Sequence, residues 1–121
     1  SSTNVLSMQT FGKRGEAMAE IEMRQRGYKI LARNYRHGKS EIDLIMQGEG
    51  LMIFVEVKTR SSNSFGFPED FVSKNQQEAI IRAANYYVEE QGWKGDIRFD
   101  IEAFVVKQTT MQIEHLKDAF Y

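Results

Sequence analysis

The alternation of apolar and polar residues along the chain predicts two amphipathic helices and five strands. Apolar side chains recur at helical spacing over residues 12–26, which Gly27 ends, and again between Ser73 and Gly92. Ser73 and Gln76 have the spacing of a capping box, which favours the start of a helix at that point. Shorter apolar or alternating runs predict strands over residues 28–34, 40–46, 51–58, 97–106 and 111–116.

The order of these elements predicts how the sheet is connected. Turns over residues 36–39 and 47–50 join the first three strands as hairpins, whereas the second helix crosses over before the fourth strand. We therefore expect a three-layer α/β domain over residues 11–121, with a central mixed five-stranded sheet flanked by helices. Residues 1–10 are expected to form a flexible N-terminal segment, and the turn-rich stretch 61–69 is expected to shape a binding site.

Composition limits the chemistry that this chain can perform. It has 121 residues and no cysteine, which excludes disulfides, iron–sulfur clusters and cysteine nucleophiles. No apolar stretch reaches the length of a membrane span, and the polar N-terminal segment lacks the pattern of a signal peptide. A cytoplasmic location without membrane contact is the expectation that follows.

The net charge of −1 hides an uneven distribution of charge. Residues 1–60 contain ten Lys and Arg against seven Asp and Glu, whereas residues 61–121 contain six against ten. A locally basic surface can bind nucleic acid even on a nearly neutral domain, although it can also be simply a solvated charged face. His37 can contact phosphate or lie solvated in its turn. The other candidate phosphate contacts in the basic half are Arg33, Arg36, Lys39 and Arg60.

Charged residues occupy two strands that are otherwise apolar. Asp43 interrupts the strand over residues 40–46, and Glu56 and Lys58 end the strand over residues 51–58. Side chains alternate across a strand, so Glu56 and Lys58 are predicted to share one face of the sheet. A carboxylate in such a place is costly unless it is paired, hydrogen-bonded or bound to a cation.

These residue types suit metal-assisted hydrolysis of a phosphodiester. Asp43, Glu56 and the backbone carbonyl of Val57 would supply oxygen ligands to Mg²⁺ or Mn²⁺. Lys58 would orient the attacking water or stabilise the charge of the transition state. Glu16 lies beside the apolar stripe of the first helix, where it either joins the metal site or only favours the helix start.

Three further residues of the helices have less specific expectations. Glu20 and Glu22 are expected to face water, because they lie off the apolar stripe of the first helix. Gln76 is expected either to cap the second helix or to reach the candidate site.

Ordered motifs spread over residues 11–120 resemble those of the YraN-like proteins, a bacterial family of predicted endonucleases. The family itself resembles the PD-(D/E)XK nuclease superfamily and the archaeal Holliday-junction resolvases. The motifs are Gly12-Lys13-Arg14-Gly15-Glu16, Glu41-Ile42-Asp43-Leu44-Ile45, Phe54-Val55-Glu56-Val57-Lys58-Thr59-Arg60, Arg98-Phe99-Asp100 and Ile113-Glu114-His115-Leu116.

The resemblance implies a restriction-endonuclease-like fold and a Mg²⁺-dependent endonuclease acting on DNA, branched or otherwise structured DNA included. It assigns the core active-site roles to Asp43, Glu56 and Lys58, and the helix-borne acid to Glu16. It also implies a homodimer, because related resolvases act in pairs. A domain of this size has little space for a module that selects the substrate, which allows for a protein partner that supplies specificity. Two alternatives are a nucleic-acid-binding module that does not cleave, and a structural or protein-interaction domain with a buried ionic network.

Overall fold

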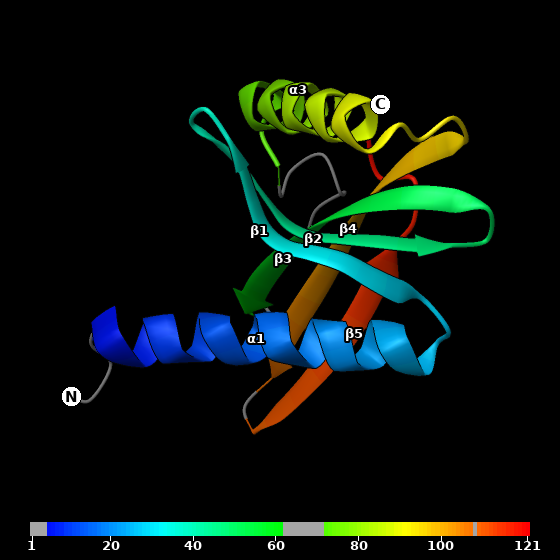
Figure 1. Ribbon diagram of the computed structural model, residues 1–121. Helices are drawn as coiled ribbons and strands as arrows, with labels where there is room; N and C mark the ends of the chain where they lie inside the picture. Colours follow the sequence, from blue (N-terminus) through cyan, green and yellow to red (C-terminus); the bar gives the residue numbers. More distant parts are fainter. Residues whose placement is uncertain (1–4, 62–71, 108) are drawn as a thin grey trace.

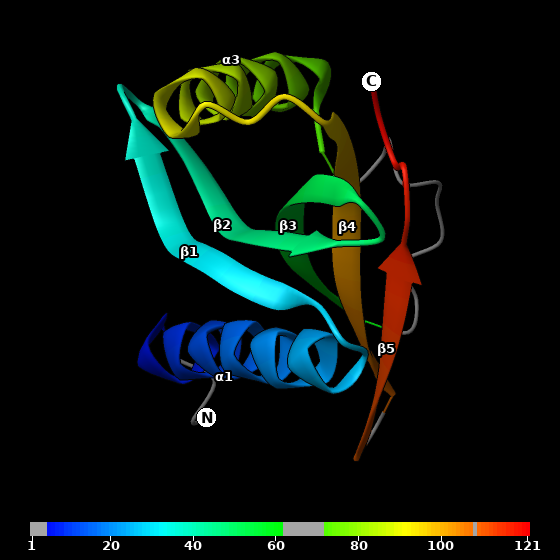
Figure 2. The same ribbon diagram turned by 45° about the vertical axis from the view of Figure 1, so that its right-hand side comes forward.

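A computed structural model describes residues 5–61, 72–107 and 109–121, and it confirms the predicted α/β architecture. The helices and strands are α1 (Val5–Gln25), β1 (Lys29–His37), β2 (Ser40–Gly48), β3 (Leu51–Ser61), α3 (Lys74–Gln91), β4 (Asp96–Lys107) and β5 (Thr110–Leu116). The strands form one sheet in the order β1-β2-β3-β4-β5. β3 and β4 are parallel, and the other neighbours are antiparallel. The helices α1 and α3 lie on opposite faces of this sheet (Figures 1 and 2).

The observed elements extend beyond several of the predicted boundaries. Helix α1 begins at Val5 instead of Gly12, because the intervening residues contain neither glycine nor proline and each adds a hydrogen bond to an existing helix. Strand β1 continues to His37, which pairs with Ser40 across a shorter turn than predicted. Residues 62–71, which include most of the predicted loop over 61–69, lie outside the described residues.

The capping signals of α3 are confirmed. The Ser73 hydroxyl accepts a hydrogen bond from the backbone N–H of Gln76, and the Gln76 side chain accepts one from the backbone N–H of Ser73. Gly92 ends the helix in the left-handed conformation, with φ of 67°, which glycine adopts at little cost. The helix therefore begins and ends where the sequence predicts.

Two hydrophobic cores hold the helices against the sheet, one on each face. On one face, Ile80 and Tyr87 of α3 belong to a cluster that includes Phe54 of β3. On the other face, Met23 of α1 packs in a cluster with Ile53 and Val55 of the same strand. No helix within the described ranges is long and apolar enough to cross a bilayer.

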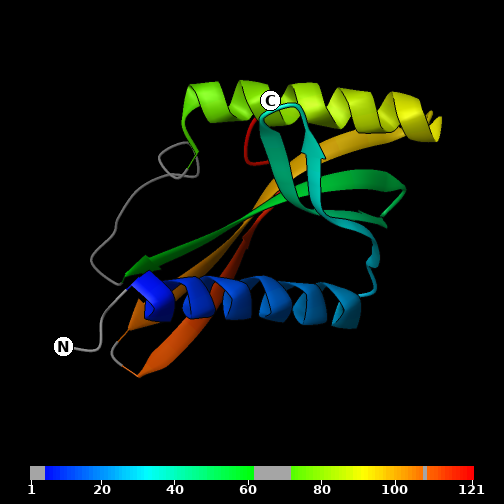
Figure 3. The same cartoon turned by 60° about the vertical axis from the view of Figure 1, so that its left-hand side comes forward.

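The sheet divides between β2 and β3. The two strands pair from Gly48 with Leu51 as far as Leu44 with Val55, and no pair follows. Beyond this point β2 stays paired with β1, and the tip of their hairpin approaches α3. β3 instead stays paired with β4 through Ser61 and runs toward the N-terminal half of α1 (Figure 3). The resulting fork opens beside Asp43 and Glu56, the next residue of each strand.

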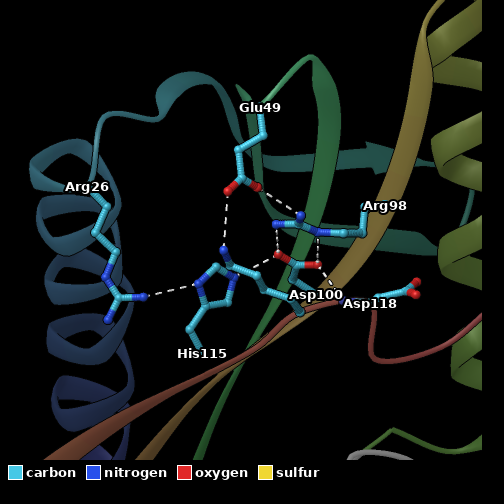
Figure 4. A network of polar contacts seen from close by, with 7 residues as sticks. Arg26, Glu49, Arg98, Asp100, His115 and Asp118 are labelled. Carbon is cyan, nitrogen blue, oxygen red and sulfur yellow. Dashed lines mark hydrogen bonds and ion pairs between the residues drawn. The ribbon is translucent and has the colours of Figure 1, made fainter.

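A buried polar network ties β4 to three other parts of the chain (Figure 4). Its centre is Asp100, whose side chain is fully buried. Asp100 accepts hydrogen bonds from Arg98 at 2.8 and 2.9 Å and from the backbone N–H of Asp118 at 3.0 Å, and its Oδ2 lies 2.7 Å from Nε2 of His115. Arg98 also binds Glu49 in the β2–β3 turn. Burial acts to raise the pKa of Asp100, but the bonds from His115, Arg98 and Asp118 outweigh it and hold the pKa below its usual value.

Glu102, two residues further along β4, is buried without such partners. Its side chain is not exposed, and neither carboxyl oxygen has a hydrogen-bond partner among the described residues. Burial, and after it the charge of Glu22, raises the pKa of Glu102 to about 8, although Arg26 opposes this shift. Glu102 therefore carries a proton at neutral pH in the folded protein.

We expect the replacement Glu102→Gln to stabilise the protein at alkaline pH. The folded state retains this proton up to about pH 8, whereas the unfolded chain releases it near pH 4.5, so the free energy of unfolding falls as pH rises between these values. Glutamine stays neutral and removes this loss, which corresponds to at most about 4 kcal/mol at pH 8 and nearly nothing at pH 4.5. Urea unfolding at pH 4.5, 6.5 and 8 measures the difference. The control is Glu114→Gln, at an exposed position of β5, and parallel pH curves for Glu102→Gln and wild type would contradict the expectation.

Candidate functional site

Asp43 lies at the base of the fork and bridges the two diverging strands. Its Oδ2 accepts a hydrogen bond of 2.8 Å from the backbone N–H of Val57. The side chain thus satisfies a backbone group of β3 just where the ladder with β2 has stopped at Val55. This bond fixes the orientation of the Asp43 carboxyl group. The structure therefore brings Asp43 and Val57 together, and a role of the Val57 carbonyl as a ligand stays a prediction.

Glu56 is the second acid of the fork and is largely buried. Its residue exposure is 8%, and its Oε1 is buried with no hydrogen-bond partner in the described part of the chain. Burial is the largest cause that raises the pKa of Glu56 to about 8, followed by the charge of Asp43 and a carboxyl–carboxyl hydrogen bond with it. Lys58 acts in the opposite direction. Two adjoining carboxyl groups with too few donors are an arrangement that a cation would relieve.

Lys58 accompanies Glu56 on the face of the sheet that α3 covers, as the alternation along the strand predicted. Its Nζ lies 3.8 Å from Oε2 of Glu56, and a quarter of its side chain is exposed. The separation is that of an ion pair without a short hydrogen bond. The ammonium group can therefore approach another anion without first breaking a tight contact.

Two hollows meet at Asp43, one on each face of the sheet. The first has a volume of about 210 Å³, and its lining residues include Glu16, Arg33 and Val57 together with Asp43. The second has a volume of about 250 Å³. Lys39, Glu41, Asp43, Glu56 and Gln76 are among the residues that line it. Asp43 belongs to both because it lies where the sheet divides.

Glu16 shares the first hollow with Asp43, while Glu56 lines the second. Over the ranges whose side chains are described, no three acidic or histidine residues are grouped closely enough to hold a metal ion. The structure therefore brings Asp43, Glu56 and Lys58 together and places Glu16 across Asp43 from them. Participation of Glu16 in a metal site stays a prediction.

The predicted phosphate contacts are distributed around the fork. Arg33 lines the first hollow, and Lys39 lines the second. Arg36 lies on the β1–β2 hairpin, where its Nη2 is 3.8 Å from Oε2 of Glu41. His37 ends β1, and its ring stacks on Tyr86 of α3 with 4.0 Å between the ring centroids.

Two further candidates were predicted at the ends of neighbouring elements. Gln76 caps α3 and also lines the second hollow, so its capping role is confirmed, whereas its part in the candidate site stays a prediction. Arg60 lies near the end of β3, and its side chain is outside the described part of the structure.

The expectation that Glu20 and Glu22 face water is wrong. Their side chains are only 18% and 20% exposed, and Glu20 binds both Arg24 and Arg33. The hydrogen bond from Arg33 is the largest cause that lowers the pKa of Glu20 to about 2. The spacing of Glu20 and Arg24, four residues apart in a helix, could have indicated one of these pairs. The pair with Arg33 depends on how β1 folds back beside α1, which local spacing does not reveal.

The divided mixed sheet between two helices, with an acid pair and a lysine at its fork, defines an α/β protein of restriction-endonuclease-like architecture. A model of the Uncharacterised protein family UPF0102 matches residues 15–104. The chain belongs to this family, which is the YraN-like family that its motifs resemble.

Curated relatives match over nearly their full length. A UPF0102 protein of Christiangramia forsetii is 43% identical over 110 residues, which cover 91% of this chain and 92% of the relative. The UPF0102 protein FP2501 of Flavobacterium psychrophilum has the same identity and coverage. A UPF0102 protein of Chlorobium chlorochromatii is 43% identical over 116 residues, covering 91% of this chain and 90% of the relative.

Proposed function

We propose that this protein is a metal-dependent endonuclease of the PD-(D/E)XK type that hydrolyses phosphodiester bonds in DNA, including branched or otherwise structured DNA. The observation that carries the proposal is the juxtaposition of Asp43, Glu56 and Lys58 at the fork of the sheet. Two acids from neighbouring strands and a lysine on the same face are the groups that this reaction requires.

The acid pair fits a divalent cation such as Mg²⁺ or Mn²⁺. Asp43 and Glu56 adjoin, and Glu56 has a buried oxygen without a partner among the described side chains. Hard oxygen ligands of this kind are those that Mg²⁺ prefers, and the ion would complete its coordination with water and with substrate. When bound, the ion would supply Lewis-acid polarisation of the phosphodiester and activation of water.

The remaining chemistry belongs to residues of the chain. Asp43 keeps its orientation through the N–H of Val57, so that one of its oxygens is directed by the fold before any ligand arrives. Lys58, with its ammonium group beside Glu56, would bind an anionic oxygen of the phosphate and stabilise the charge that develops there. Arg33 and Lys39, one at each hollow, would bind phosphates on either side of the cleaved bond.

The proposal is tested by incubating the purified protein with a four-way junction, a flap and a single strand, each with Mg²⁺, with Mn²⁺ and with EDTA. We expect cleavage of at least one substrate with metal and none with EDTA. Binding that weakens with salt but never leads to cleavage would instead support the non-catalytic nucleic-acid-binding module. Sedimentation of the free and DNA-bound protein would test the predicted homodimer.

Lys58→Ala is expected to separate turnover from metal binding. Loss of one positive group aimed at the developing charge reduces kcat about 100-fold or more, whereas both carboxylate ligands remain. Mn²⁺ affinity, measured by calorimetry for wild type and variant at the same pH, should change little. Lys94→Ala, at an exposed position after α3, is the charge-matched control. A large loss of Mn²⁺ affinity with Lys58→Ala would contradict the role assigned to Lys58.

A further inference from the structure

An ion pair at the first hollow joins α1 to β1. Nε of Arg33 donates a hydrogen bond of 2.6 Å to Oε2 of Glu20, and Nη2 of the same guanidinium binds Oε1. Both residues line the hollow that contains Asp43. The two parallel bonds fix the plane of the guanidinium as well as its distance from the acid, which a single bond or a lysine would not do.

Arg24 binds the same carboxylate from the outer side. Its Nε and Nη2 donate to Oε1 of Glu20 at 3.2 and 3.0 Å, but it is not among the residues that line the hollow. One acid thus lies between two arginines, and the group of three retains a net positive charge. The side chain of Glu20 is 18% exposed, whereas that of Arg33 is 56% exposed. The acid is therefore the inner part of the pair, and the guanidinium retains an edge open to solvent.

We infer that Glu20 is a positioning residue, which holds Arg33 so that the open edge of its guanidinium binds a DNA phosphate next to Asp43. This inference rests on the proposed nuclease function. Arg33 has N–H groups beyond those that Glu20 engages, so it can bind an acid and a phosphate at once. Holding the side chain in advance removes the cost of ordering it when DNA binds.

The direction in which Glu20→Gln changes the affinity for DNA distinguishes a positioning role of Glu20 from mere neutralisation of the basic surface. Glu20→Gln removes a negative charge from a basic surface, which by itself strengthens the binding of DNA. If Glu20 instead positions Arg33, the same substitution weakens binding about three- to tenfold despite the gain in positive charge. The test measures the affinity for a labelled DNA four-way junction by fluorescence anisotropy over a range of salt, with Ca²⁺ replacing Mg²⁺. KM and kcat follow from cleavage with Mg²⁺, where KM should rise and kcat should stay.

Matched variants complete the experiment. Arg33→Met should weaken binding and make the salt dependence shallower by about one phosphate contact. Arg33→Lys keeps the charge but loses the paired hydrogen bonds, and should still bind more weakly than wild type. Arg24→Met removes an equal charge from the same acid outside the hollow, and should have a smaller effect than Arg33→Met. In the Arg33→Met background, Glu20→Gln should cause no further weakening. Thermal melting verifies that each variant is folded.

Each remaining outcome decides against the inference. Tighter or unchanged binding by Glu20→Gln would overturn it and leave the nuclease function standing if the wild type cleaves. An undiminished effect of Glu20→Gln in the Arg33→Met background would show that Glu20 acts through another group. A wild-type protein that neither binds nor cleaves DNA would overturn both this inference and the proposed function.

Discussion

Glu56→Gln and Asp43→Asn should each reduce cleavage about 1000-fold or more. Each replaces a negatively charged metal ligand by a neutral amide of the same shape, and the metal contributes several kcal/mol of transition-state stabilisation. The measurement is single-turnover cleavage of whichever DNA the wild type cuts. Glu114→Gln, an exposed substitution of the same kind on β5, should retain full activity. Wild-type rates in both site variants would remove the assigned mechanism.

The same two variants should differ in stability, and this difference separates a catalytic site from a structural ionic network. Burial and the neighbouring charge of Asp43 raise the pKa of Glu56, so the folded state holds a proton that the unfolded state releases, and the free energy of unfolding falls as pH rises from about 4.5 to 8. Glu56→Gln removes this loss and should be at least as stable as wild type at pH 8. Asp43→Asn keeps an acceptor for Val57 and should lose about 1 kcal/mol or less. Unfolding of both variants at neutral pH would favour the structural alternative.

Asp100→Ala should cause the largest loss of stability of any single substitution considered. It leaves the guanidinium of Arg98, the ring of His115 and the backbone N–H of Asp118 without their common acceptor in a buried place. Removal of one partner from such a network costs about 3–5 kcal/mol. Urea unfolding at pH 7 measures this loss, and a value below 1 kcal/mol would contradict the role of the network.

Glu49→Ala is the matched control, because it removes an exposed carboxylate from the outer end of the same network. Exposed ion pairs contribute at most about 1 kcal/mol, so this variant should stay close to wild type.

The low pKa of Asp100 makes its contribution to the free energy of unfolding depend on pH. This contribution is present above the usual aspartate pKa near 4 and is lost as pH falls through the lower pKa of the folded state. Stabilities of wild type and Asp100→Ala should therefore converge in acid.

The sequence predicted the parts of the fold that depend on local periodicity and on capping chemistry. The alternation along β3 placed Glu56 and Lys58 on one face, and Ser73 with Gly92 marked the two ends of α3. These features depend on neighbours within a few residues, which one sequence displays directly. The charged residues in apolar strands also indicated the site, because burial without compensation is costly for each of them.

The remaining features depend on contacts between distant segments. Glu20 was expected to face water because the partner that buries it, Arg33, lies on a different element. The sequence did not indicate that Glu102 is buried, because a charged residue in an alternating strand usually lies on the side that faces solvent. Here α1 covers that side of β4. The fork likewise depends on where the pairing of β2 with β3 stops while the pairing of β3 with β4 continues. Periodicity shows that a strand exists but not which neighbour it keeps along its length.

The fork also determines when the site can form as the chain is synthesised. Beyond Val55, the described part of β3 has β4 as its only strand partner, so Glu56 and Lys58 are held in the sheet by residues 101 and 103. Glu16, Asp43, Glu56 and Lys58 all precede that strand in the chain and are therefore synthesised before it. A nascent or truncated chain ending before Asp96 would contain every one of these residues and still lack the rigid surface that sets their spacing.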